Sequence, residues 1–233
     1  MSHSQACSDV AAVLVTHNPD QEALRASINA VAGQVSNVFV VDNGSRNFPD
    51  QWLETLGDGC VARLHFLPQL DNLGIGAGHN LGIEQARMHG AAFVLLLDQD
   101  SQVYPGMVAQ LRSSYAALTQ TGIRVACVGP RYHDPQNSAL SKFVRVGLLG
   151  FTLIDCKQDS AVVEVDFLVS SGSLLPLSPL LDIGLMDESL FIDHVDTEWC
   201  FRAKTKGYKL FGVCDAYCTH LSHNKHLSCY LRR

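Results

Sequence analysis

Short apolar runs alternate with amphipathic stretches through the first half of the chain. Apolar runs of strand length occupy residues 11–16, 37–41, 62–67 and 92–97. Between them, the spacing of apolar positions predicts helices over residues 21–31 and 52–56, and another from the glycines at 74–82 towards residue 89. Strands that alternate with helices are typical of a doubly wound, mostly parallel sheet. The first half therefore predicts an α/β fold.

The pattern changes after about residue 130. Residues 142–154 and 162–169 form longer β-type segments with glycine breaks, which suit a small antiparallel extension, and residues 209–213 are strand-like. Residues 193–206 predict a helix that Asp193 caps, with acidic residues early and basic residues late, as the helix dipole favours. At 233 residues the chain has the length of one domain, and it contains no visible linker.

Polar residues end three of the predicted strands. Thr16, Asp42 and Asp98 each follow or close an apolar run. Ligands of doubly wound sheets bind beyond the carboxyl ends of the strands, so these residues predict a nucleotide site at one edge of the sheet. Asp42 also opens the sequence Asp-Asn-Gly-Ser, which forms a good plain turn without any ligand.

Two acidic pairs indicate the chemistry of this site. Asp98 and Asp100 are two positions apart, so both carboxylates can project to one side and share a Mg²⁺ or Mn²⁺ with a diphosphate. Asp196 and Glu198 begin the helix at 193–206, where one of them can take a proton from an acceptor hydroxyl. Glycosyl transfer from a nucleotide sugar needs both kinds of carboxylate. The plain alternatives are a solvated turn for the first pair and acids stabilised by the helix dipole for the second.

Three further features have both a functional and a structural interpretation. The glycines between Asn72 and Asn80 can let backbone approach a base or diphosphate closely, or can simply pack the start of a helix tightly on the sheet. Trp199 can offer an aromatic face to a sugar while half of it joins the core. His220 can bind the metal or the diphosphate, or can be structural.

Composition excludes several classes of protein. An apolar fraction of 47% with 17% charged residues is typical of a folded globular chain, and a net charge of −6 argues against a nucleic-acid binder. Residues 1–10 do not resemble a signal peptide, and no apolar run is long enough to span a bilayer, so we expect a cytoplasmic protein. The eight cysteines are scattered, and several lie in apolar segments where reduced, buried thiols are expected. A zinc site at Cys214, Cys218, His220, His223 and His226 is disfavoured because the spacing lacks paired halves.

Taken together, the motifs resemble glycosyltransferase family 2, and the last of them resembles its rhamnosyltransferase branch. The stretches that carry the resemblance are residues 12–19 (AVLVTHNP), 40–45 (VVDNGS), 72–77 (NLGIGA), 96–100 (LLDQD) and 191–203 (FIDHVDTEWCFRA). The resemblance implies a GT-A fold and an inverting, metal-dependent transfer from a nucleoside-diphosphate sugar. It also implies a nucleotide-sugar-binding half at about 10–130 and an acceptor-binding, catalytic half at about 131–225. The end at Arg233 lacks a clear closing element, which suggests a longer native chain.

Residue roles follow from the resemblance by position. Nucleotide-sugar binding would fall to Thr16, Asn18, Asp42, Asn72, Gly74 and Asp98; the metal would be held by Asp98, Asp100 and His220; Asp196 would be the base; and the acceptor side would include Ser171, Gly172, Glu198 and Trp199. Two positions depart from the family: Val195 stands where Glu often precedes the base, which leaves Glu198 open as the base, and His79 replaces a smaller residue.

The expected function is transfer of L-rhamnose from dTDP-rhamnose to a glycan or lipid-linked acceptor in bacterial surface-polysaccharide synthesis. Without a membrane-spanning segment, such a protein would associate with the membrane only peripherally. Three alternatives remain open at this stage: transfer from another UDP- or dTDP-sugar, a nucleotidyltransferase, and a glycan-binding module without activity. A nucleotidyltransferase should carry a glycine-rich run with Arg or Lys after its first strand, and Thr16-His-Asn-Pro19 does not.

Overall fold

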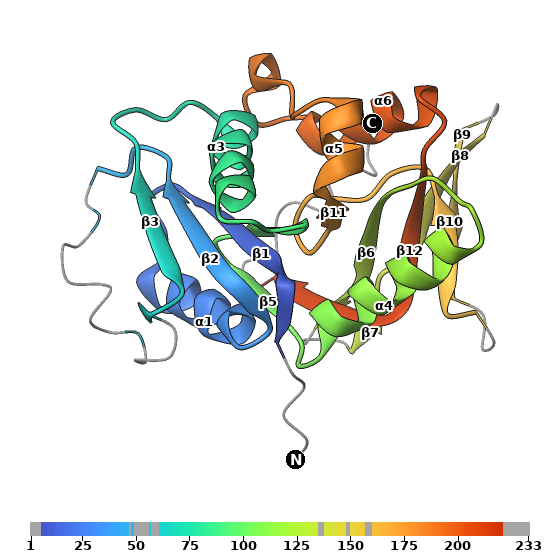
Figure 1. Cartoon of the computed structure of the whole chain (residues 1–233), viewed down its shortest axis with the longest axis horizontal. Coiled ribbons are helices and arrows are strands. Elements are labelled where there is room, and N and C mark those ends of the chain that lie inside the picture. The colour runs from blue at the N-terminus through green and yellow to red at the C-terminus, as the bar shows by residue number, and fades with distance from the viewer. Residues whose placement is uncertain are drawn as a thin grey trace.

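The protein is described here from a computed structural model, which covers residues 6–46, 48, 56, 61–134, 138–147, 150–156 and 160–220, with only the backbone of His220. One sheet of ten strands extends through both halves of the chain (Figure 1). Its main path runs in the order β10-β12-β6-β11-β4-β1-β2-β3, and a separate hairpin joins β8 to β9. The predicted α/β class, a mostly parallel sheet with a small antiparallel part, is confirmed.

The first half folds as its alternating pattern predicts. Its elements in chain order are β1 (Cys7–Thr16), α1 (Gln21–Ala32), β2 (Val35–Asp42), β3 (Leu64–Pro68), α3 (Ile75–Met88) and β4 (Phe93–Asp98). β1 pairs in parallel with both β2 and β4, and β2 pairs in parallel with β3. The short helix expected at 52–56 falls outside the described residues, except for Leu56.

The second half contains more structure than its pattern predicts. Its elements are β5 (Ser101–Val103), α4 (Met107–Gln120), β6 (Val125–Asp134), β7 (Ala139–Leu140), β8 (Phe143–Gly147), β9 (Gly150–Ile154), β10 (Val162–Val165), β11 (Leu174–Pro176), α5 (Leu177–Ile183), the 3₁₀ turn η2 (Glu188–Leu190), α6 (Val195–Thr205) and β12 (Lys209–His220). The expected antiparallel segments appear as β8, β9 and β10. β11 lies between β4 and β6 and is antiparallel to both.

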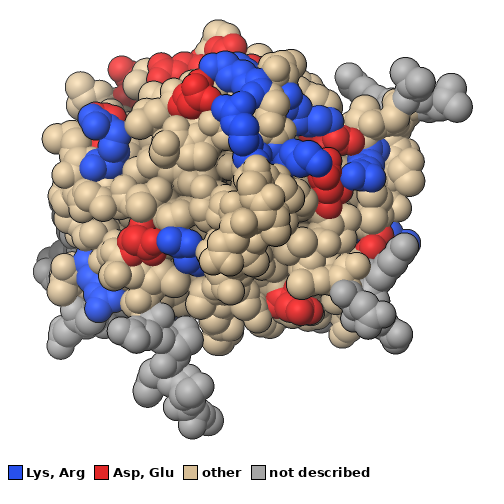
Figure 2. All heavy atoms as spheres, turned by 45° about the vertical axis from the view of Figure 1, so that its right-hand side comes forward, with Lys and Arg blue, Asp and Glu red and all other residues tan. Residues whose placement is uncertain are grey.

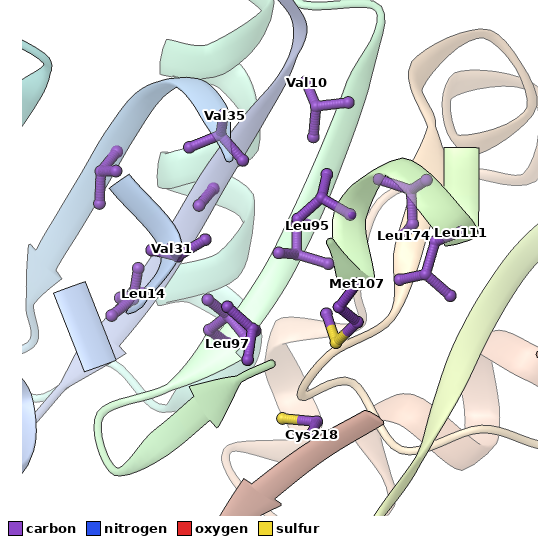
Figure 3. Packing of buried hydrophobic residues seen from close by; sticks show 14 of the residues in the cluster. Val10, Leu14, Val31, Val35, Leu95, Leu97, Met107, Leu111, Leu174 and Cys218 are labelled. Carbon is purple, nitrogen blue, oxygen red and sulfur yellow. The ribbon is translucent and has the colours of Figure 1, made fainter. Parts of the chain in front are cut away.

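Helices cover both faces of the sheet because its inner strands are apolar on both sides. In β1, Val10, Ala12 and Leu14 face the core that includes α1 and α4, while Ala11 and Val13 face the core that includes α3, α5 and α6. Figure 3 shows the first core, in which β1 and β4 residues meet Met107 and Leu111 of α4. This alternation fixes which way each strand faces and so fixes the side chains at its carboxyl end.

One cysteine pair departs from the prediction of reduced thiols. Cys156, just after β9, forms a disulfide with Cys214 in β12, so the prediction is wrong for this pair. Among the described cysteines, Cys7, Cys127, Cys200 and Cys218 are free, as expected. The disulfide also removes Cys214 from the zinc cluster, whose members His223 and His226 lie outside the described residues.

The surface on the β10–β12 side carries both signs of charge. Figure 2 shows Lys and Arg side chains interleaved with Asp and Glu on this face. The ion pairs between neighbouring elements here include Lys204–Asp166, Lys209–Glu164 and Arg124–Asp182. Within the described part of the chain, no helix is both long and apolar enough to cross a bilayer.

Candidate active site

A cleft of about 650 Å³ opens at the carboxyl ends of the central strands. The parallel register places Thr16 opposite Asp42 and Val15 opposite Asp98, so the polar strand ends converge as the sequence predicts. The polar side chains that line the cleft come from both halves: Thr16, His17, Asn43, Asn72, Asp98, Gln99, Asp100, Tyr132, Ser141, Lys142, Ser170, Ser171, Ser173, Asp193 and Asp196. The four carboxylates face a single Lys or Arg among these residues, Lys142.

Thr16 marks the end of the cleft nearest β1 and β2. Its side chain is 1% exposed, and its hydroxyl has no hydrogen-bond partner within the described structure. A buried hydroxyl without a partner costs about 1–3 kcal/mol. A polar ligand in the cleft would remove this cost, so Thr16 fits a site for the polar part of a nucleotide.

Asn43 joins the end of β2 to the loop before α3. Its amide nitrogen donates to Asn72 Oδ1 and to the Gly74 carbonyl, both at 2.9 Å, and its Oδ1 accepts the Leu73 N–H at 3.0 Å. Sequence reasoning did not single out Asn43 as a site residue, although it quoted the turn that contains it. The buried Asn43 (3% exposed) therefore holds the loop from Asn72 to Gly74 in place in the cleft wall.

The glycines of α3 serve packing more than ligand contact. At Gly74, with φ of +87°, a Cβ would lie 2.4 Å from the Phe191 carbonyl oxygen. At Gly78 and Gly82 a Cβ would collide with the side chains of Val15 and Val13, at 2.6 and 2.2 Å. Gly74 lines the cleft, whereas Gly78 and Gly82 let the helix pack closely on β1, as the structural alternative predicted.

Asp42 and Asn18 lie behind the cleft rather than in its lining. Asp42 is 4% exposed and accepts a hydrogen bond from the Ser45 hydroxyl at 2.5 Å. Asn18 accepts the Arg46 N–H at 3.0 Å and donates its own N–H to Ser45 Oγ at 2.7 Å. Both residues tie the loops after β1 and β2 together. Contact with a nucleotide stays a prediction for both.

Asp98 and Asp100 meet in the cleft wall at the end of β4. Their negative charge acts on a buried neighbour: burial, together with the charges of Asp98 and Asp100, raises the pKa of the Cys218 thiol to about 12. The register of β5 with β12 places His220 opposite Ser101, one residue after Asp100. No three His, Cys, Asp or Glu side chains of the described residues cluster as a ready-made metal site. Two hard carboxylates on the wall of one cleft fit a divalent ion that takes its remaining ligands from water and a diphosphate.

Asp196 lies in the first turn of α6 and lines the same cleft. Its carboxylate accepts the Ser170 N–H at 3.2 Å and the Thr197 N–H at 2.8 Å. Burial raises the pKa of Asp196, although these hydrogen bonds oppose the shift. A carboxylate with a raised pKa is a stronger base than an exposed one, which suits proton abstraction.

The start of α6 differs from the prediction. The helix begins at Val195 and not at Asp193, and its N-cap is His194, at φ of +66° and without a capping side-chain hydrogen bond. The left-handed turn at His194 leaves Asp193 free of the capping role, and Asp193 lines the cleft instead. Asp193 therefore lies before the helix, while Asp196 and Glu198 lie in its first turn.

Three predicted acceptor-side residues have other partners. Trp199 is 2% exposed and donates its indole N–H to the Gly184 carbonyl at 2.9 Å, so its assignment as a sugar platform is corrected to a core residue. Glu198 forms a two-point ion pair with Arg202, at 2.7 and 2.8 Å, and does not line the cleft. Gly172 adopts φ of +79°, where a Cβ would lie 2.7 Å from Pro130, so it shapes a turn. Ser171 lines the cleft, and its contact with an acceptor stays a prediction.

Comparison with known sequences assigns the chain to a family. Residues 11–166 match the model described as Glycosyl transferase family 2. The chain belongs to this family. This family 2 glycosyltransferase is 30% identical over 214 residues to dTDP-rhamnosyl transferase RfbF of Shigella flexneri, covering 91% of this chain and 69% of that protein. It is also 28% identical over 223 residues to Galactofuranosyltransferase GlfT1 of Mycolicibacterium smegmatis, covering 92% and 70%.

Solved structures confirm the GT-A fold of this family 2 glycosyltransferase. GalNAc-T7, solved with UDP, GalNAc and Mn²⁺, matches with a TM-score of 0.72 at 14% identity. A fragment of S. aureus TarS in complex with UDP matches with a TM-score of 0.58 at 18% identity. The alignments cover 91% of this chain in both cases, but only 43% of the GalNAc-T7 chain and 60% of the TarS chain.

Proposed function

We propose that this chain is an inverting, metal-dependent rhamnosyltransferase that moves L-rhamnose from dTDP-rhamnose to a glycan or lipid-linked acceptor. The reaction would serve the assembly of a bacterial surface polysaccharide such as an O-antigen or capsule. The observation that carries the proposal is that a half-buried carboxylate whose pKa is raised, Asp196, lines the same cleft as Asp98 and Asp100. The similarity to a dTDP-rhamnosyl transferase over 91% of the chain supports the choice of donor.

Asp196 would act as the base. Its carboxylate takes the proton of the acceptor hydroxyl while that oxygen attacks the anomeric carbon, and the bond from this carbon to the diphosphate breaks. Attack from the face opposite the leaving group inverts the anomeric configuration. Glu198 is a poor competitor for this role because its two oxygens are held by Arg202 outside the cleft.

Asp98 and Asp100 would hold Mg²⁺ or Mn²⁺. A bound divalent ion offsets the negative charge that develops on the departing diphosphate. The Asp98 N–H bonds to Ser171 Oγ at 3.0 Å, which holds the backbone at the end of β4 beside the cleft. His220 would complete the site from β12.

Thr16, Asn72 and Gly74 would bind the nucleoside, with Asn18 and Asp42 supporting the loops around it. The unpartnered Thr16 hydroxyl is the best placed of these for a polar contact. His17 and Asn43 join this group: the His17 N–H bonds to Gln99 Oε1 at 2.9 Å, which connects the β1 loop to the acidic turn.

The second candidate is transfer of another sugar from UDP or dTDP. The similarity to a galactofuranosyltransferase at 28% identity and the structural neighbours solved with UDP favour it. A thermal-shift panel of nucleotide sugars with Mn²⁺ separates the two, because a ligand at 100 times its dissociation constant stabilises the folded state by about 2.7 kcal/mol. Preferential stabilisation by dTDP-rhamnose supports the first candidate.

The decisive experiment compares Asp196→Asn with Glu198→Gln in rhamnosyl transfer, while thermal shift monitors donor binding. Loss of a general base costs about 10²–10⁴-fold in rate, so we expect Asp196→Asn to lose transfer and keep donor binding. Glu198→Gln should lose only the ion pair with Arg202 and stay active. The reverse ranking would give the base role to Glu198, and unchanged transfer in both variants would reject the mechanism.

This proposal includes a cytoplasmic location at the inner face of the membrane, because the proposed donor is a nucleotide sugar, which we expect in the cytoplasm. The disulfide between Cys156 and Cys214 runs against it, since cytosolic glutathione keeps most thiols reduced. Mass spectrometry of alkylated protein from intact cells decides the state of this pair. A fully alkylated pair supports the cytoplasmic location.

A further inference from the structure

We infer that the turn at residues 170–173, clamped by Tyr132, is a positioning element that sets the metal-side carboxylates and the base in register with each other. The inference rests on the proposed function and adds a positioning role for two residues of the cleft lining. It concerns chiefly Ser171, which bonds to the Asp98 backbone, and Tyr132, which bonds to the Ser171 carbonyl.

Ser171 is the link to the metal side. Its side chain is 2% exposed, and its Oγ accepts the backbone N–H of Asp98 at 3.0 Å. The same oxygen lies 2.6 Å from Ser101 Oγ, at the start of β5. One hydroxyl therefore holds both ends of the Asp98–Asp100 turn.

Ser170 is the link to the base. Its backbone N–H donates to Asp196 Oδ2 at 3.2 Å, and this bond fixes the carboxylate against the turn. Ser170 and Ser171 are adjacent, so one peptide unit separates the group that holds the base from the group that holds the acidic turn. A movement of either residue displaces the other.

Tyr132 and Gly172 fix the turn in the sheet. The Tyr132 hydroxyl, at the end of β6, donates to the Ser171 carbonyl. The Gly172 N–H donates to the Leu96 carbonyl at 2.7 Å, and Leu96 in turn donates its N–H to the Ser173 carbonyl at 3.0 Å. The turn is thus held from β4 on one side and from β6 on the other, which are the strands that flank β11.

This arrangement predicts effects on metal binding and on the pH profile that a merely structural residue would not have. A residue with a merely structural role would lower stability and leave the chemistry of the folded fraction unchanged. A positioning residue at this point should alter both sides of the cleft at once: the metal concentration that the protein needs, and the pH dependence of the base. Since the Ser170 N–H lowers the pKa of Asp196, loosening the turn should move the acidic limb of the rate profile to higher pH.

The experiment uses Ser171→Ala and Tyr132→Phe in the whole chain. Mn²⁺ is titrated in the presence of dTDP, with thermal stabilisation as the readout, and kcat is measured against pH at saturating donor. Losing one hydrogen bond corresponds to a change of roughly three- to tenfold in an equilibrium constant. We expect each variant to need that much more Mn²⁺, to lose kcat with little change in donor KM, and to shift the acidic limb upward.

Two controls match the chemistry of the variants. Ser36→Ala removes a hydroxyl that donates to the Val10 carbonyl at 2.8 Å, and Tyr208→Phe removes one that donates to Asp182 at 2.8 Å, both away from the cleft. These should leave the Mn²⁺ requirement and the pH profile unchanged. Tyr132→Phe keeps its ring and its packing, so it provides the test if Ser171→Ala fails to fold.

The outcomes separate the inference from the function on which it rests. If wild-type protein transfers rhamnose and both variants match it in Mn²⁺ requirement and pH profile, the inference is overturned and the function stands. If wild-type protein transfers no sugar, the function is rejected, and the Mn²⁺ titration with dTDP still decides the metal side. A shift on only one side of the cleft also overturns the inference, because coupling of the two sides is its content.

Discussion

His79 is a buried imidazole without a hydrogen-bond partner among the described residues. It lies in α3, is 1% exposed, and neither ring nitrogen has a hydrogen-bond partner in the described structure. Burial lowers the pKa of His79 to about 4, from an ordinary value of 6.5. Between these two values the unfolded chain binds a proton that the folded protein does not. Stability must therefore fall as the pH drops below about 6.5, until the loss is complete near pH 4.

The size of this loss follows from the shift. A difference of about 2.5 pKa units, at 1.36 kcal/mol each, gives about 3 kcal/mol in total. About 2 kcal/mol of this is lost by about pH 5. Replacing the ring by an apolar side chain removes the titration, and it also removes two unpaired nitrogens whose burial is unfavourable at any pH. His79→Leu should therefore be no less stable than wild type near pH 7 and more stable at pH 5.

The assay is urea unfolding of wild type and His79→Leu near pH 7 and near pH 5, followed by circular dichroism. With a slope of about 3 kcal/mol per molar, the two midpoints should separate by about 0.7 M more at the lower pH. The comparison must be between variants, because partial burial and the charge of His89 also lower the pKa of His65. His133→Gln, which replaces a half-buried histidine bonded to Tyr104, controls for loss of an imidazole elsewhere.

A parallel loss of stability in both proteins would refute the reasoning. It would mean that His79 meets water or a hydrogen-bond partner in solution. The same result for His133→Gln as for His79→Leu would show that the effect does not depend on burial at position 79.

Three further substitutions test the site and the packing. Asp100→Asn should keep the fold but abolish most transfer at low Mn²⁺, as measured by activity against metal concentration; normal activity there would remove Asp100 from the metal site. Thr16→Val should leave the melting temperature equal or higher and reduce thermal stabilisation by dTDP, and full stabilisation would place the nucleoside elsewhere. Gly82→Ala should destabilise by about 1–3 kcal/mol in urea because its Cβ would meet Val13 at 2.2 Å, whereas Gly33→Ala, with no atom within 4 Å, should not; equal effects would refute the packing argument.

The strands and helices of the first half were predictable because periodicity reports burial directly. β4 is apolar on both faces and reads as a continuous run, and Thr16, Asp42 and Asp98 close their strands as expected. The second half was harder, since β11 has only three residues and owes its existence to β4 and β6 on either side. A segment that short carries no period of its own.

The acidic residues of the site were predictable from the sequence, but most of the residues that hold the site in place were not. Asp98, Asp100 and Asp196 all line the cleft. Trp199 does not, because its indole N–H bonds to the Gly184 carbonyl in the core, and its position in the motif gives no sign of that contact. Asn43 was overlooked since an Asn in a turn looks ordinary until its contacts with distant backbone are known. The disulfide joins residues 58 positions apart, and no spacing rule reveals such a pair.

β11 lies between β4 and β6 in the sheet but is synthesised after both, so the sheet of the first half cannot be completed until the second half is made. β4 ends at Asp98 and β6 at Asp134, yet the strand between them comes from residues 174–176, and β12 follows only at Lys209–His220. While the chain is still emerging from the ribosome, β4 and β6 have open edges, which are sites of misassociation. The first and second halves of this chain therefore cannot be exchanged as separate modules, because neither half contains a finished sheet.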